Sequence, residues 1–517
     1  MLKREISKSH LLFISFAAIF GSGWLFAPLY AAQIAGPASL IAWALGALIS
    51  AVIGITMAEV VVLYPRSGGL SQISGMTHGE FLSLLITLLN LVVFTILPAI
   101  EVRAVLQYGA SHFPELVNPD RSFSMMGYGV ALALLALITL VNLYGARITA
   151  ALTQVIVLFK IVTPALICFS FLYAIGGSRA FDLARLLPQE AGRGIPWTQV
   201  FQAIATSGII FSFNGFNQAT MFAGEAKNPQ RAIPFAILGS LLASGLLYLA
   251  IQYAFLMAVP AESFAHGWNS LTFPHDEGPF AGLAILLGLG SLLAVIYADA
   301  VISPLGTAFS YASAAPRILY GLTEGSKLSF SRNLLKLNSY GISPVLVGLI
   351  LIVECLAFIF LPSLKAMISL LVAAFVLSYT VAPASLLALR KTHPQLHRPF
   401  RVFWAPLTSF LSVFFSNLMV FSCGWGAVRN LIAVVLVLVA IFGVQVTLRD
   451  RSVLFVKMRG SIWFFFQLFA LGGLAYSDHQ SQLPFWVSAS CVGALSAVAL
   501  VLSRKFSNEG IESHRVS

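Results

Sequence analysis

Apolar residues run in long unbroken stretches along most of this 517-residue chain. Runs of about 20 apolar residues, enough to cross a bilayer as a helix, recur from Leu11 nearly to the C-terminus. The runs lack the alternation of outer-membrane strands, so helices are favoured over a barrel. The pattern predicts an all-α polytopic membrane protein with about 14 spans. We expect them at 11–35, 38–63, 80–110, 125–145, 147–176, 197–224, 232–258, 279–315, 343–361, 364–389, 404–422, 430–448, 461–476 and 484–503.

Polar connectors divide these helices into groups. The loop RKTHPQLHRPFR at 390–401 is the most basic of them, and ten helices precede it. Two of the ten carry glycine interruptions at corresponding positions of two five-helix halves, FGSGW at 20–24 and FSFNGFNQ at 211–218, which is typical of an inverted repeat with its binding site between the repeats. The predicted segments are an N-terminal cytoplasmic tail 1–10, a first repeat 11–176, an external loop 177–196, a second repeat 197–389, a basic cytoplasmic loop 390–403, four accessory helices 404–503 and a cytoplasmic tail 504–517.

Composition agrees with a membrane location, since 58% of the residues are hydrophobic and only 9% are charged. The net charge of +11 reflects orientation, because most basic residues fall on one side when the N-terminus is placed inside. We therefore expect no nucleic-acid partner, and we place both termini in the cytoplasm. The basic clusters are Lys3, Arg4 and Lys8, Arg317 to Lys336, Arg390 to Arg401, Arg449 to Arg459, and Arg504 with Lys505.

Little in the sequence suggests an enzyme or a metalloprotein. The first apolar run continues past any short signal-peptide core to Ala35, so we expect an uncleaved first span. The four cysteines stand singly in apolar helices without metal-ligand spacing. Histidines such as His112 and His393 fall in connecting loops, with no nucleophile elbow or phosphate loop. We predict no catalytic activity, no metal and no cofactor.

The first glycine interruption falls near the middle of the membrane. Gly21 lies about 15 Å along a helix that begins near Leu11. Glycine weakens a helix by about 1 kcal/mol relative to alanine, and Ser22 can bond to local backbone, so the helix is expected to unwind there. Unwound N–H groups suit a carboxylate, and unwound carbonyls suit an ammonium or a cation. Close helix packing by small residues is the alternative, and the matching interruption with Asn214, Gly215 and Asn217 argues against it.

Two long stretches resemble a known transporter family. FGSGWLFAPLYAAQIAGPASLIAWALGALISAVIGITMAEVVVLYPRSGG is similar to the first two helices of the amino acid–polyamine–organocation (APC) transporters. IIFSFNGFNQATMFAGEAKNPQRAIP is similar to that family's helix 6 and the loop after it. The resemblance covers about residues 10 to 400 and implies a ten-helix inverted repeat shared with the sodium-coupled leucine transporter, alternating access and amino-acid substrates. With YADAVISPLGTAFSYASAAPRILYG at 297–321, the chain looks most like the branch associated with aspartate and glutamate proton symport.

The resemblance also assigns a substrate site. The backbone around Ser22, Gly23 and Trp24 is expected to hold the substrate carboxylate, and carbonyls near Phe211 to Asn214 its ammonium. Gly215 permits the break in helix 6. Phe213 and Phe216 are candidates for an aromatic lid, with ordinary packing as the alternative.

Ionisable residues in mid-membrane are functional candidates by default. Lys160 lies midway along helix 5, where burial disfavours the charged amine and so suits a group that takes up and releases a proton. Proton-coupled members of the family have a lysine of helix 5 in the place of the second sodium ion, so Lys160 is our proposed proton carrier, with a structural ion pair as the alternative. Asp299 and Ser303 share one face of helix 8 and are expected opposite Lys160. Sodium could use the same oxygens and is the competing coupling ion.

Other charged residues leave alternatives open. Glu101 and Arg103 are two apart in helix 3 and are expected towards its outer end. Arg103 either recognises an acidic side chain of the substrate or snorkels to the outer interface. Glu59 and Glu225 match family positions near cytoplasmic ends and are expected to be structural or conformational. Glu354, in helix 9, receives no role.

These observations predict an amino-acid importer of the bacterial inner membrane, driven by proton symport. An amino-acid exchanger or a sodium symporter of the same fold is the alternative, and a channel or nutrient receptor is the alternative from another class. The expected partners are a small amino-acid substrate and the lipid bilayer. The last four helices either join two copies in a homodimer or pack only against lipid.

Overall fold

The protein is a bundle of helices. The computed structural model describes residues 6–65, 69–118, 120, 122–144, 146–176, 195–264, 266–273, 278–325, 336, 338–339, 342–361, 363–447 and 458–507. In this part of the chain β-structure is limited to isolated bridges, so the predicted all-α class is confirmed. The helices are α1 Lys8–Ile19, α2 Gly23–Ala35, α3 Ser39–Leu63, α4 Leu70–His78, α5 Glu80–Gly109, α6 Met125–Val141, α7 Ala146–Ala174, α9 Trp197–Thr206, α10 Ile209–Ser212, α11 Gln218–Met221, α12 Pro229–Ala258, α13 Pro279–Leu286, α14 Leu293–Gly325, α16 Pro344–Phe360, α17 Leu364–Tyr379, α18 Val381–Thr392, α19 Ala405–Ser422, α20 Gly424–Thr447, α22 Ile462–Ser481 and α23 Phe485–Lys505.

Many of these helices suit a membrane. Within the described residues, eight helical stretches are long and apolar enough to cross one, and α1, α6 and α16 are among shorter apolar helices. Several polar residues fix where helices begin: Ser124, Ser343 and Ser363 each accept a hydrogen bond from a backbone N–H in the first turn. Most of the predicted external loop 177–196, the ends of both tails, 326–335 and the region 448–457 lie outside the described residues, as does the side chain of Glu225.

Both helices that were expected to be interrupted by glycine are interrupted. The first helix stops at Ile19 and restarts at Gly23, which leaves Phe20, Gly21 and Ser22 outside regular helix. The segment expected as one helix over 197–224 is divided into α9, α10 and α11. Between α10 and α11 the chain passes through Gly215 with φ +118°, a conformation that favours glycine.

Two other expected helices are also divided. The segment predicted as 279–315 is split into α13 and α14, because Gly288 turns the chain with φ +71°. The segment 364–389 is split into α17 and α18 at Thr380, and α18 begins at the next residue, Val381. A short helix that the apolar runs do not predict, α4, lies between α3 and α5.

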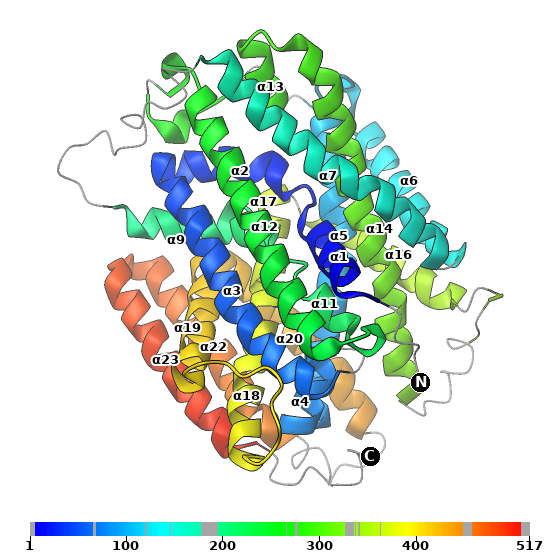
Figure 1. Ribbon diagram of the computed structural model, residues 1–517, viewed down its shortest axis with the longest axis vertical. Coiled ribbons are helices and arrows are strands. Elements are labelled where there is room, and N and C mark those ends of the chain that lie inside the picture. Colours follow the sequence, from blue (N-terminus) through cyan, green and yellow to red (C-terminus); the bar gives the residue numbers. More distant parts are fainter. Residues whose placement is uncertain are drawn as a thin grey trace.

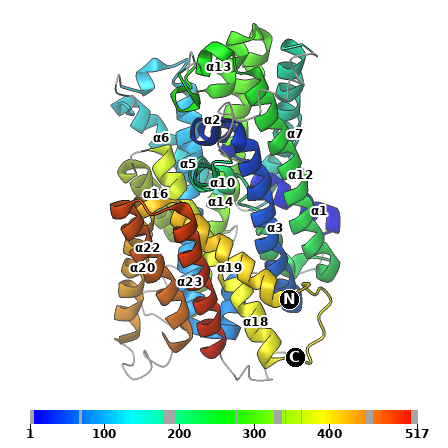
Figure 2. The same cartoon turned by 90° about the vertical axis from the view of Figure 1, so that its left-hand side faces the viewer.

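The helices pack in three groups. In the first, α1, α2 and α3 contact α9, α10 and α12; in the second, α5 contacts α6, α14 and α16. The third consists of α19, α20, α22 and α23, the orange and red helices of Figure 1. Figure 2 shows α6 and α16 on the opposite side of the molecule from α1, α3 and α12. α17 and α18 connect the groups, since α17 contacts α5 and α19, and α18 contacts α3 and α23.

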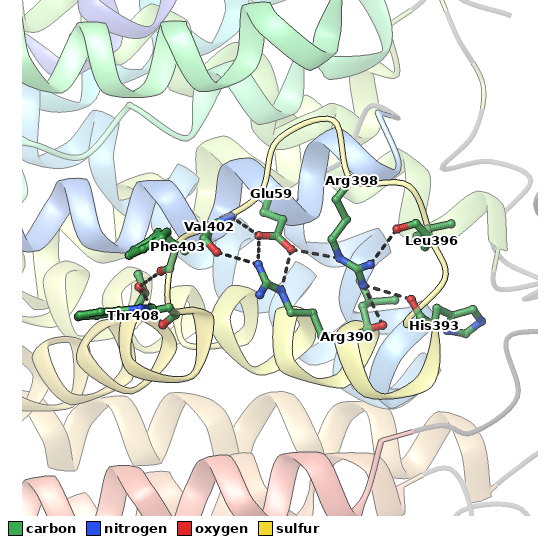
Figure 3. Close-up of polar contacts among 10 residues, drawn as sticks. Glu59, Arg390, His393, Leu396, Arg398, Val402, Phe403 and Thr408 are labelled. Atoms are coloured by element: carbon green, nitrogen blue, oxygen red, sulfur yellow. Dashed lines mark hydrogen bonds and ion pairs between the residues drawn. The ribbon is translucent and has the colours of Figure 1, made fainter.

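The loop after α18 is fixed by one buried carboxylate (Figure 3). Glu59, near the end of α3, accepts two hydrogen bonds from Arg390, at 2.7 and 3.1 Å, and one from the Val402 N–H at 2.6 Å. Arg398 lies 3.3 Å from the same carboxylate and donates to loop carbonyls, among them that of His393. The Glu59 carboxylate therefore neutralises part of the basic charge of this loop, in line with the expected structural role of Glu59.

Candidate functional site

The C-terminal end of α1 presents carbonyls that the broken helix cannot pair, since the last four C=O groups of a helix have no partner within it. Side chains from two other helices take up two of them. Lys160 Nζ of α7 donates to the Ala17 carbonyl at 3.1 Å, and Thr307 Oγ1 of α14 donates to the Phe20 carbonyl at 3.2 Å. Lys160 also bonds to Thr307 Oγ1 at 2.6 Å. A buried ammonium thus lies at the negative end of a helix dipole.

The N-terminal end of α2 has the opposite partner. Glu101 of α5 is fully buried, and its Oε2 accepts the Ser22 N–H at 2.9 Å. Its other oxygen lies so close to Gly21 that a Cβ there would come within 2.5 Å of it. A carboxylate at a helix N-terminus is stabilised by the unpaired N–H groups and the helix dipole. Glu101 lies in the last third of α5, and this part of α5 meets the break between α1 and α2.

The two breaks touch each other. A Cβ on Gly215 would come within 2.5 Å of the Ala18 carbonyl carbon, so this glycine allows the backbones to meet. Tyr248 of α12 joins them, since its hydroxyl lies 3.1 Å from both the Ile19 carbonyl and the Ser212 carbonyl. The unwound segments are thus held by protein side chains, as lipid requires of exposed backbone.

A small cavity lies at this junction. Asn214 is on its wall, with its amide oxygen accepting from the Tyr379 hydroxyl at 2.7 Å and its amide nitrogen 3.4 Å from the Tyr311 hydroxyl. Backbone, carboxylate, amide and hydroxyl groups therefore surround one space between the first and second helix groups. The lining residues are Ala18, Ile19, Gly21, Leu97, Glu101, Phe211, Asn214, Thr307 and Tyr311.

The residues predicted for coupling lie along one face of α14. Asp299, Ser303 and Thr307 are one turn apart, and all three are buried. Lys160 contacts Thr307 and acts electrostatically on both Asp299 and Glu101. Within the described part of the chain, neither carboxylate oxygen of Asp299 has a partner with good hydrogen-bond geometry. The Thr163 side chain lies near enough to interact with this carboxylate.

Several predicted substrate residues lie beside the cavity without lining it. Trp24 is fully buried with its ring 5.1 Å from that of Phe280. Phe213 packs edge-on against Trp43, at 5.8 Å between ring centroids. Phe216 lies 5.5 Å from the Tyr379 ring, again by centroid. Gly23 packs so tightly on α10 that an added Cβ would overlap Ser212. Phe211 and Asn214 do line the cavity.

Two further charged residues lie away from the breaks. Arg103 donates to the Phe358 carbonyl at 2.8 Å and the Leu361 carbonyl at 3.1 Å, at the end of α16. Its guanidinium also lies 4.9 Å from the Phe123 ring centroid. Glu354 of α16 is buried and accepts a hydrogen bond from the Thr139 hydroxyl of α6. Both residues connect helices of the second group.

The sequence-based site omitted Glu101, Tyr248, Tyr311 and Tyr379. Glu101 carried a usable signal, since a carboxylate in an apolar helix is a functional candidate. The tyrosines carried none, because their hydroxyls become informative only when the fold brings them to Ile19, Ser212 and Asn214.

Paired broken helices that meet around buried polar backbone define a class of protein: the secondary transporters, whose substrate sites lie at such breaks. The amino acid permease family model matches residues 6–444, and the chain belongs to that family.

Comparisons with known proteins agree with this assignment. The glutamate/serine transporter AimA of Bacillus subtilis is 29% identical over 482 residues, which are 92% of this chain and 88% of the transporter. The aspartate-proton symporter of the same organism is 31% identical over 443 residues, with 85% and 83% covered. A mutant of the Eremococcus coleocola manganese transporter has the same fold, with a TM-score of 0.52, 13% identity, and coverage of 90% of this chain and 96% of that one.

Proposed function

We propose that this chain imports amino acids across the bacterial inner membrane by proton symport with alternating access. The observation that carries the proposal is the pair of opposite charges at the first helix break. Lys160 binds a carbonyl at the end of α1, and Glu101 binds an N–H at the start of α2. These are the two kinds of backbone group that an amino acid would use.

The substrate carboxylate is proposed to bind the N-terminus of α2 around Ser22, Gly23 and Trp24. Glu101 already occupies the Ser22 N–H, so an arriving carboxylate must share or displace this bond. Two carboxylates at one site repel each other unless one of them is neutral. Protonation of Glu101 would remove the repulsion, so substrate binding and proton binding would favour each other.

The α-ammonium is proposed to bind near Phe211 and Asn214, at the end of α10. Phe211 and Asn214 line the cavity, and α10 directs its C-terminal carbonyls towards the break. Phe213 and Phe216 would act through packing, since their rings contact Trp43 and Tyr379. Gly215 keeps the two breaks in contact.

The proton pathway is proposed to include Lys160, Asp299 and Ser303. Lys160 has a carbonyl and a hydroxyl as acceptors and two carboxylates within electrostatic reach. A sodium ion would need the same oxygens, and the ammonium already occupies them. This geometry favours proton over sodium as the coupling ion.

Acidic amino acids and serine are the substrates that we propose to test first, because relatives are a glutamate/serine transporter and an aspartate-proton symporter. Arg103 is proposed to brace α5 against α16 and not to read the substrate, since its guanidinium is bonded to carbonyls at the end of α16.

The helices are proposed to form a 5+5 inverted repeat, with residues 11–176 and 197–389 as the repeats and 404–503 as four accessory helices. The basic loop 390–403 and both termini would then face the cytoplasm. The interruptions at Ser22 and Gly215, in the first helix of each repeat, support this arrangement.

Uptake of radiolabelled L-glutamate, L-aspartate and L-serine into proteoliposomes tests the function. A proton gradient, acidic outside, should drive accumulation without sodium, whereas a sodium gradient at uniform pH should not. Lys160→Ala should lose gradient-driven accumulation, with Lys365→Ala, an exposed lysine at the start of α17, as the matched control. Sodium-driven uptake that ignores pH would identify a sodium symporter. Uptake that requires amino acid inside the vesicle would identify an exchanger, and flux at ion-channel rates would identify a channel.

A further inference from the structure

A buried polar network crosses the accessory helices. Gln467 of α22 is fully buried, and its Nε2 donates to Asn417 Oδ1 of α19 at 2.7 Å. Asn417 donates in turn to Ser496 Oγ of α23 at 2.9 Å. Amides inside a membrane protein are costly unless they are hydrogen-bonded, so a linked set of amides between three accessory helices requires an explanation.

The network extends beyond the accessory helices. The second hydrogen of the Gln467 amide points to Thr380 Oγ1, at 3.3 Å. Thr380 is the single residue between α17 and α18, and its hydroxyl donates to the Leu377 carbonyl at 2.7 Å, so it can only accept from Gln467. Pro383, four residues after Tyr379, has no N–H to continue the helix ladder. Gln467 therefore bonds to the helix interruption itself.

Tyr379, the residue before this interruption, contacts the wall of the small cavity at the helix breaks. Its hydroxyl donates to Asn214 Oδ1 at 2.7 Å, and Asn214 lines the cavity at the second helix break. Tyr379 and Thr380 are adjacent, so the position of the Tyr379 side chain depends on the backbone at Thr380. A continuous path thus runs from Gln467 of α22 through Thr380 and Tyr379 to Asn214 on the wall of the cavity.

We propose that Gln467 is a positioning residue for the substrate site. By fixing the backbone at Thr380, it lets Tyr379 hold Asn214 in the geometry that binds substrate. This gives the accessory helices a role in affinity, and it rests on the proposed transport function. The alternative is that the network only holds the accessory helices together, in which case its loss would lower stability and leave the substrate site unchanged.

The test compares KM for proton-driven uptake, using whichever of L-glutamate, L-aspartate and L-serine the wild type carries fastest. Gln467→Met keeps the length of the side chain and removes the hydrogen bonds, and Thr380→Val removes only the hydroxyl. Each should raise KM about fivefold, the factor that corresponds to one net hydrogen bond of about 1 kcal/mol, with kcat changed less than KM. Thr380→Ser keeps the hydroxyl and should restore the wild-type KM.

Two controls separate positioning from stability. Ser496→Ala removes a bond at the far end of the same network and should lower the melting temperature without changing KM. In a Tyr379→Phe background, Gln467→Met should raise KM no further, because the link to Asn214 is already missing. If Gln467→Met does not fold, Thr380→Val with its Ser rescue carries the test.

The outcomes are distinguishable. An unchanged KM in both Gln467→Met and Thr380→Val overturns the positioning role, as does an equal rise in KM in Ser496→Ala. An additive effect in the Tyr379→Phe background also overturns it. These results would leave the proposed transport function intact, whereas a wild type without uptake of any of the three amino acids contradicts that function directly.

Discussion

Glu101 lies where the carboxylate of a substrate is expected. Its Oε2 accepts the Ser22 N–H at the start of α2, and Lys160 binds the Ala17 carbonyl at the end of α1. Each end of the broken helix therefore has a side chain of the charge that its dipole favours. In the absence of substrate, this arrangement satisfies backbone groups that water cannot reach.

Glu101→Gln should separate substrate binding from coupling. The glutamine amide oxygen can still accept the Ser22 N–H, so the break should keep its shape. The neutral side chain cannot release a proton, so accumulation driven by a proton gradient should be largely lost. Counterflow of substrate between equal pools should continue, because it needs no net proton movement. Accumulation at the wild-type level in Glu101→Gln would remove Glu101 from the coupling step.

Glu59→Gln should destabilise the protein without acting at the substrate site. The Glu59 carboxylate is 1% exposed and faces Arg390 and Arg398, whose side chains are 22% and 8% exposed. Removing one partner of a buried ion pair costs about 3–5 kcal/mol, because the remaining charges lose their counterion. We expect a clearly lower melting temperature in detergent, with Glu115→Gln, an exposed carboxylate of the loop after α5, as the control. Equal melting temperatures for the two variants would contradict the structural role of Glu59.

At the scale of helices, the sequence predicts the interruptions at Gly21 and Gly215 because glycine and asparagine are unusual in an apolar run. It does not predict the division at Thr380, although Pro383 is a local signal for it, and the bond from Gln467 depends on the fold. Nor does it predict that Glu101 meets the Ser22 N–H, because this contact joins residues that are 79 apart in the chain. A local signal alone was not sufficient, since the division at Gly288 was also missed although a glycine makes it.

Gly215→Ala tests whether the two breaks must touch. An added methyl would overlap the Ala18 backbone, at 2.5 Å from its carbonyl carbon, and φ is +118°. Overpacking of this kind costs about 1–3 kcal/mol, and the backbone conformation adds strain. Uptake should fall at least about tenfold, a 1.4 kcal/mol effect. Gly348→Ala on α16 is the control, because nothing lies within 4 Å of its Cβ position. Full activity of Gly215→Ala would mean that the contact between the breaks is dispensable.

At the scale of the whole molecule, the site lies between the first and the second helix group. α1, α2 and α3 pack on α12, and α14 and α16 pack on α5. The hydrogen bond from the Ser22 N–H, before α2, to Glu101 of α5 spans the boundary between these two groups. Relative movement of the two groups would therefore break or form the contact that a substrate replaces. Alternating access follows from this arrangement if each break opens towards one side of the membrane in turn.

The proposed orientation predicts which residues a reagent on each side of the membrane can label. Arg401, in the basic loop, and Asn269, between α12 and α13, are both exposed. The positive-inside rule places Arg401 in the cytoplasm, and α12 is long enough to carry Asn269 to the other side. After replacement of the four native cysteines by alanine, Arg401→Cys should react with a membrane-impermeant maleimide only in inside-out vesicles, and Asn269→Cys only in right-side-out vesicles. The reverse pattern would invert the topology, and labelling of both positions from one side would mean that the segment between them crosses the membrane an even number of times.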